Sequence, residues 1–195
     1  MITTIELRWF CQGMIPAVVE HWFDNDCPGE WLGQPEERED LYLHITPKCD
    51  YLNLKLRQGR LEVKWRKAEL GIRRFGNAWE GHIEQWGKWM CEDPEQQSFL
   101  PHTIIEQEPW ISVYKKRRQR LYQLPSTSQS CSVELTQLKV AENLWWSLAF
   151  EVAEIPPDLI DSLQNTIHAA SQTYQGSELK AQNSYAYPHW LALTV

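Results

Sequence analysis

The sequence predicts an α+β protein in which antiparallel strands close into a β-barrel, a tunnel with a polar, charged interior and covering helices. Two observations carry this prediction. Several segments alternate apolar and polar residues with the period of two that is typical of a half-buried strand. The polar positions of these segments are mostly charged. If the strands close on one another, their charged faces line an interior, and their apolar faces form a core beneath helices.

Length and composition favour a single domain that spans residues 1–195. A chain of this length can bury one sizeable core, and 43% hydrophobic residues with 11 Trp supply the apolar area. Glu6 and Arg8 interrupt the segment in which a signal peptide needs an apolar core, and no stretch is long and apolar enough for a membrane span. We therefore expect a cytoplasmic protein with no membrane partner.

Basic residues are concentrated in two short segments, although the formal net charge is −7. Residues 48–74 hold nine and residues 115–120 hold five, which together make 14 of the 19 Lys and Arg. The acidic balance argues against general nucleic-acid binding. The local concentration instead suits a small-molecule polyphosphate or another anionic ligand. The sequence does not indicate an oligomeric state.

The N-terminal part of the chain predicts two strands separated by a helix and a loop. Residues 4–10 alternate as a strand does. Residues 16–23 begin with Pro and continue with apolar residues at a spacing that suits a short helix. Residues 24–39 are rich in Pro, Gly and acids and predict a loop, and residues 40–45 alternate again as a second strand.

Residues 50–66 predict a β-hairpin that turns at Gln58, Gly59 and Arg60. The polar face of this hairpin carries four basic side chains: Lys55, Arg57, Lys64 and Arg66. Like charges on paired strands repel one another unless interleaved acids, water or a bound anion offset them. A polyanionic ligand is therefore one explanation of this face, and a solvated sheet surface with Glu62 interleaved is the other.

The C-terminal half of the chain predicts three more strands. They cover residues 110–124, 132–138 and 145–154, whereas residues 78–90 show features of both helix and strand and are left mixed. The polar faces of the three strands carry Lys116, Arg118, Arg120, Glu134 and Glu151.

The remaining segments predict connections and a helix. Residues 91–109 predict a loop and residues 125–130 a polar turn. Asp158 can cap a helix that runs to about Tyr174, and residues 184–191 form a small aromatic terminus.

The charged segments follow one another in an order that a known family shares. Residues 4–8 read TIELR, residues 54–57 and 61–64 read LKLR and LEVK, residues 116–118 read KRR, and residues 150–153 read FEVA. This order resembles the CYTH superfamily, the triphosphate tunnel fold of adenylate cyclases, thiamine triphosphatases and inorganic triphosphatases. TIELR is similar to the family's ExExK strand and FEVA to its ExE strand.

The resemblance implies a tunnel that binds a triphosphate or an organic polyphosphate. The phosphate oxygens would be held by Arg8, Lys55, Arg57, Lys64, Arg66, Lys116, Arg118 and Arg120. A divalent cation, Mg²⁺ or Mn²⁺, would be held by Glu6, Glu134 and Glu151. Glu6 and Arg8 would be the catalytic residues of a metal-dependent triphosphatase-type phosphohydrolase.

The sequence departs from the family at positions that matter for turnover. Thr4 replaces the first glutamate of ExExK, Ala153 replaces one of the last pair, and Arg8 replaces the lysine. Arginine keeps the charge and the bidentate phosphate geometry but does not exchange protons. Two alternatives therefore stand beside the phosphohydrolase: a non-catalytic module that binds a phosphate ligand, and a barrel whose aromatic residues bind a large organic acid.

Overall fold

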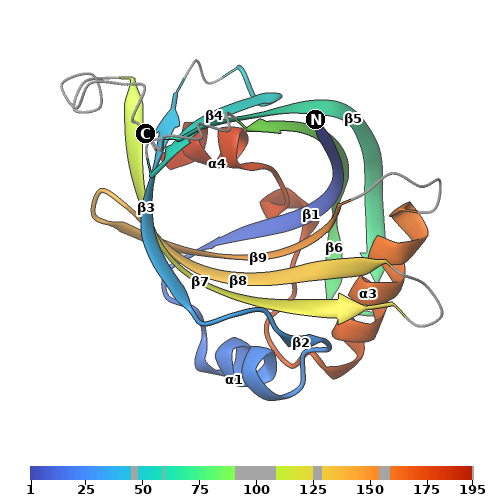
Figure 1. The fold of residues 1–195 in the computed structure, drawn as a ribbon. Coiled ribbons are helices and arrows are strands. Elements are labelled where there is room, and N and C mark those ends of the chain that lie inside the picture. Colours follow the sequence, from blue (N-terminus) through green and yellow to red (C-terminus); the bar gives the residue numbers. More distant parts are fainter. Residues whose placement is uncertain (45–47, 59, 91–108, 125–128, 154–158, 195) are drawn as a thin grey trace.

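Within its described ranges, the computed structural model forms an antiparallel β-barrel closed by eight strands, together with three α-helices (Figure 1). The predicted α+β class and the closed antiparallel barrel are therefore confirmed. No helix in this part of the chain is long and apolar enough to cross a membrane. The structure describes residues 1–44, 48–58, 60–90, 109–124, 129–153 and 159–194.

The barrel strands follow the order β7, β3, β4, β5, β6, β1, β9 and β8, and β8 pairs back with β7 to close the ring. Every neighbouring pair is antiparallel. A short additional strand, β2 (Glu30–Trp31), pairs with β7. The barrel strands are β1 (Ile2–Gln12), β3 (Glu36–Leu43), β4 (Leu52–Arg57), β5 (Arg60–Phe75), β6 (Trp79–Met90), β7 (Trp110–Gln123), β8 (Ser130–Val140) and β9 (Asn143–Ala153).

Two strands, β3 and β5, extend furthest beyond the bounds that the sequence predicts. The predicted loop at 24–39 contains β2 and the first half of β3. The start of β3 was hidden because residues 36–40 are charged on both faces of the strand, so they show no hydrophobic period. β5 continues past Arg66 to Phe75, and register shifts in its pairing with β6 interrupt the alternation.

The segment left mixed between helix and strand is the strand β6, and its two glycines have a packing reason. A Cβ atom at Gly81 would lie 2.6 Å from the Leu7 side chain, and one at Gly87 would lie 2.6 Å from the Trp65 ring. The side chains of Leu7 and Trp65 therefore occupy the space that a side chain at Gly81 or Gly87 would need. This close approach explains why the sequence of β6 lacks the usual strand composition.

The main hydrophobic core lies outside the barrel, beneath α1 (Ala17–Asn25) and α3 (Leu159–Thr173). Trp9, Trp22 and Trp79 are almost completely buried there and pack ring against ring. The barrel thus turns its apolar face outward toward the helices, and these three tryptophans belong to the core that forms there.

A second apolar cluster lies inside one end of the barrel. The C-terminal segment, predicted as a small aromatic terminus, forms the helix α4 (Tyr187–Thr194) after the short 3₁₀ helix Ala181–Asn183. Figure 1 shows α4 within the ring of strands. Trp190 and Leu191 pack against inward-facing residues of β1, β3, β7 and β8. The helix therefore closes this end of the barrel.

Three predictions lie largely outside the described residues. They are the loop at 91–109, the turn at 125–130 and the helix cap at Asp158.

Replacing Trp190 by alanine should lower the free energy of unfolding by about 3–5 kcal/mol, because the indole is fully buried in the cluster around α4. Urea denaturation followed by circular dichroism measures the change. Leu193→Ala on the same helix is the control, since Leu193 is 56% exposed and should change the value by less than about 0.5 kcal/mol. Equal effects of the two variants would contradict a packed end closure.

Candidate functional site

A cavity of about 150 Å³ lies inside the barrel, and Tyr185, Tyr187 and Pro188 before and within α4 form part of its wall. Charged side chains dominate the remaining wall. Among the described residues, the basic ones are Arg8, Arg38, Lys55, Arg57, Lys64, Lys88, Lys115 and Arg117. The acidic ones are Glu6, Glu84, Glu134 and Glu151.

The structure brings most of the predicted site residues together around this cavity. Those that line it are Glu6, Arg8, Lys55, Arg57, Lys64, Glu134 and Glu151. Arg66 lies beside the cavity wall and pairs with Glu84 at 2.9 Å and with Asp50 at 3.0 Å. The hairpin and the strands β1, β8 and β9 therefore present the faces that the alternation in their sequences predicts.

The basic residues predicted on β7 lie on the other face of that strand, away from the cavity. Lys116 pairs with Glu37 on the exposed side of β3, and Arg118 pairs with Asp24 of α1. Arg120 donates hydrogen bonds to three backbone carbonyl oxygens at and just after the end of α1. Arg118 and Arg120 therefore attach α1 to the barrel.

The inner face of β7 carries Lys115, Arg117 and Gln119 instead. Alternation alone gave no way to choose between the two faces, because both are basic from residue 115 to residue 118. The deciding feature is α1, whose acidic residues lie against the outer face.

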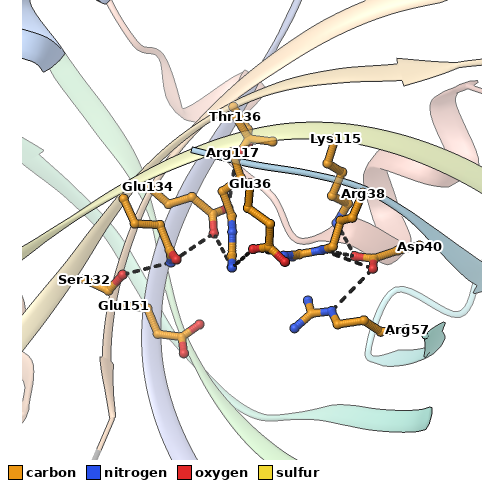
Figure 2. Close-up of polar contacts among 12 residues, drawn as sticks. Glu36, Arg38, Asp40, Arg57, Lys115, Arg117, Ser132, Glu134, Thr136 and Glu151 are labelled. Atoms are coloured by element: carbon orange, nitrogen blue, oxygen red, sulfur yellow. Dashed lines mark hydrogen bonds and ion pairs between the residues drawn. The ribbon is translucent and has the colours of Figure 1, made fainter. Parts of the chain in front are cut away.

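Three basic side chains converge on one fully buried carboxylate, Asp40 of β3 (Figure 2). The Asp40 oxygens lie 3.2 Å from Arg38 Nε, 3.3 Å from Arg57 Nε and 3.1 Å from Lys115 Nζ. Burial alone would raise the pKa of Asp40, but the charges of Lys115, Lys55 and Arg57 hold it well below its usual range. Asp40 is therefore ionised and acts as an internal counterion.

A second buried acid, Glu62 of β5, is shared in the same way. Its carboxylate lies 2.9 Å from Lys55 Nζ, 3.2 Å from Arg57 Nη1 and 3.6 Å from Lys88 Nζ. Burial opposes ionisation, but Lys55 and Arg57 lower the pKa of Glu62 to about 2. Asp40 and Glu62 together therefore serve five basic side chains.

This crowding of cations changes the protonation of two lysines. Burial, with added repulsion from Arg38 and Arg8, lowers the pKa of Lys115 to about 7, although Asp40 opposes the change. Burial and repulsion from Arg57 and Lys115 likewise hold the pKa of Lys55 well below its usual range. Burial thus disfavours the ammonium forms of both lysines, and a further anion beside them would favour these forms.

Glu134 of β8 holds the basic side chains of β1 and β7. Its carboxylate lies 3.0 Å from Arg8 Nη1. It also lies 3.4 Å from Arg117 Nη1 and accepts a hydrogen bond of 3.2 Å from the Thr136 hydroxyl (Figure 2). Arg117 also pairs with Glu36. Burial alone would raise the pKa of Glu134, but the attraction of the two arginines outweighs burial and holds the pKa below its usual range. The acid therefore stays ionised.

The three glutamates predicted to hold a metal ion do not meet. Glu6 and Glu151 lie opposite one another on β1 and β9 and share Lys64, whereas Glu134 belongs to the separate cluster with Arg8. No group of three His, Cys, Asp or Glu residues in the described ranges has the arrangement of a metal site. These acids as they stand do not fit the predicted Mg²⁺ or Mn²⁺ site.

Sequence reasoning missed several cavity residues for identifiable reasons. Arg38 lies in the stretch predicted as a loop, and Glu84 and Lys88 lie on β6, which was left mixed. The charged residues Glu36, Arg38 and Asp40, which share a face, are the signal for the first half of β3, whereas the alternation of residues 40–45 predicts its second half.

Neither a protein-family model nor a curated protein sequence matches the chain. The closed antiparallel barrel is compatible with a tunnel fold.

Replacing Asp40 by asparagine should lower the free energy of unfolding by about 3–5 kcal/mol, because the three basic side chains around it lose their shared counterion. Thermal or urea denaturation measures the change. Glu37→Gln is the control on the same strand, since Glu37 is exposed and pairs only across the outer surface with Lys116 and Tyr114 in the described structure. A stability loss as small as that of the control would contradict the assigned role of Asp40.

Proposed function

We propose that the protein binds a compact polyanion, a triphosphate or an organic polyphosphate, inside the barrel. The observation that carries this proposal is the convergence of eight Lys and Arg on the cavity wall among the described residues, several of which share one carboxylate, since Asp40 and Glu62 each pair with three of them. Phosphate oxygens are strong acceptors for ammonium and guanidinium donors, and these charge-assisted bonds strengthen where water is excluded.

The distribution of charge supports the same ligand. The strands β3, β4, β6 and β7 bring five basic side chains around Asp40 of β3 and Glu62 of β5. The low pKa of Lys115, caused mainly by burial and further by neighbouring cations, marks a place where an added negative charge relieves repulsion. A polyanion in this position supplies the counter-charge that the protein's own acids do not.

The size of the cavity favours a compact ligand over a large organic acid. Its volume of about 150 Å³ is smaller than the roughly 300–1,000 Å³ that pockets for drug-sized molecules occupy. The aromatic wall formed by Tyr185 and Tyr187 is part of the packed cluster around α4. These rings therefore support the closed end of the barrel, and the charged wall is the better candidate for ligand contact.

Hydrolysis of the bound phosphate is the second candidate, and it would place the protein with the CYTH triphosphatases. Arg8 supports it, because Glu134 at 3.0 Å and Ser147 at 3.1 Å fix a guanidinium where charge would develop on a phosphoryl group. Glu6 is a weak proton acceptor, since Lys64 and Thr4 overcome the effect of burial and lower its pKa to about 2. Binding is therefore our conclusion, and turnover is an outcome to be measured.

Tripolyphosphate should bind to the wild-type protein in isothermal titration calorimetry and raise its melting temperature. Arg57→Ala should weaken binding by about tenfold or more, since it removes a charged donor from the cavity wall. Arg73→Ala is the matched control, because Arg73 is an exposed arginine of β5 outside the cavity wall. A phosphate-release assay with and without Mn²⁺ tests turnover. Absence of binding, or equal binding by the two variants, would contradict the proposal.

Binding of tripolyphosphate should take up protons near pH 7 through Lys115. The unliganded pKa of Lys115 is about 7 because burial and nearby cations disfavour its ammonium form. A bound anion raises this pKa, so affinity should fall as the pH rises from 6 to 8.

Calorimetry in two buffers of different ionisation enthalpy gives the number of protons taken up. Lys115→Met is the matched variant, and the difference between the two proteins removes the ligand's own titration. The same proton uptake in both proteins would show that Lys115 does not sense the ligand.

A further inference from the structure

Three glutamates form a row across neighbouring strands on the inner face of the barrel. In the strand registers, Glu6 of β1 lies opposite Glu84 of β6 on one side and opposite Glu151 of β9 on the other. All three line the cavity. Carboxylates placed side by side repel one another, and a divalent cation is a common counterion for such a set.

A lysine from a more distant strand neutralises the middle of this row. Lys64 belongs to β5, which is separated from β1 by β6. Its ammonium group reaches past β6, forms an ion pair with Glu6 and lies 3.2 Å from Glu151 Oε2. One side chain thus bridges the two carboxylates from a single point between them.

The other contacts of these glutamates, from Thr4 and Arg66, do not lie between Glu6 and Glu151 in the described structure, so the Lys64 ammonium occupies that position. The Thr4 hydroxyl donates a 2.6 Å hydrogen bond to Glu6 Oε1, the same oxygen that contacts Lys64. Thr4 is itself paired with Ala153, so the next pair of positions adds no carboxylate. Glu84 is held separately by Arg66 at 2.9 Å.

The electrostatics of the pair make it permanent at physiological pH. Burial alone would raise the pKa of Glu6 and lower that of Lys64. Their mutual attraction reverses both effects, so the pKa of Glu6 falls to about 2 and that of Lys64 rises above its usual range. The carboxylate and the ammonium group both stay charged.

We propose that the Lys64 ammonium takes the place of a divalent cation between Glu6 and Glu151, so that the cavity binds its polyanion without Mg²⁺ or Mn²⁺. An ammonium group has three N–H donors. The contacts with Glu6 and Glu151 account for two, and a third can serve a phosphate oxygen, which gives the bridge that a metal ion would make. The replacement of the cation rests on the contacts of Lys64 alone, whereas the role toward a polyanion rests on the proposed function.

Titration with Mn²⁺, followed by calorimetry and by the electron paramagnetic resonance signal of the free ion, tests the replacement directly. Wild-type protein should show no saturable Mn²⁺ binding at Glu6 and Glu151. Lys64→Met leaves the two carboxylates without their counterion and should bind Mn²⁺ at least about tenfold more tightly than wild type. Adding Glu151→Gln to this variant should abolish the gain.

Lys116→Met is the control, because it removes the same charge from the outer face of the barrel and should leave Mn²⁺ binding as in wild type. Equal binding by Lys64→Met and Lys116→Met would overturn the proposal. Saturable Mn²⁺ binding by wild type that Glu6→Gln removes would also overturn it, and this arm needs no folded Lys64 variant. If Lys64→Met folds poorly, added Mn²⁺ should raise its melting temperature.

The same proteins separate this inference from the proposed function. Tripolyphosphate should bind to wild type in EDTA, with no divalent cation present, if Lys64 replaces the cation, and binding that requires Mn²⁺ would overturn the replacement. If tripolyphosphate binds neither in EDTA nor in Mn²⁺, the proposed function is contradicted. The Mn²⁺ titrations then still decide the role of Lys64.

Discussion

The need to neutralise charge inside a closed barrel governs this structure. Eight strands turn charged faces inward, and closure removes much of the water that would otherwise solvate them. An isolated charge in such a place costs several kcal/mol, so each one needs a partner of opposite sign. Asp40, Glu62 and Glu134 provide those partners, and each is shared by two or three basic side chains. The shared acids fix the basic side chains in position, and five of these side chains gather around Asp40 and Glu62.

The same network divides the cavity into two walls of different character. Cations predominate where β3, β4, β5 and β7 meet, and carboxylates stand in a row where β6, β1 and β9 meet. Lys64 connects the two walls, because it belongs to the basic hairpin and ends between the carboxylates of Glu6 and Glu151. The proposed polyanion binding and the proposed independence from metal ions therefore both rest on one arrangement of ion pairs.

The sequence predicts which side chains face the cavity only where the two faces of a strand differ in polarity. On β1 and in the hairpin, apolar residues mark one face, so Arg8, Lys55 and Lys64 were placed correctly from alternation alone. On β7 both faces are basic, and only the contact of Arg118 with α1 decides which one is outside. The sharing of Asp40 by three cations depends on contacts between strands far apart in the sequence, which no local pattern contains.

The closure of one end of the barrel by α4 limits the routes by which a ligand can enter and leave the cavity. Within the described residues, Trp190 and Leu191 fill the lumen at that end. A ligand of the proposed kind must enter and leave by the same side. A linear polymer would then present only its terminus to the basic wall, and its length beyond the first few groups would remain in solvent. Selectivity would therefore act on chain ends rather than on chain length.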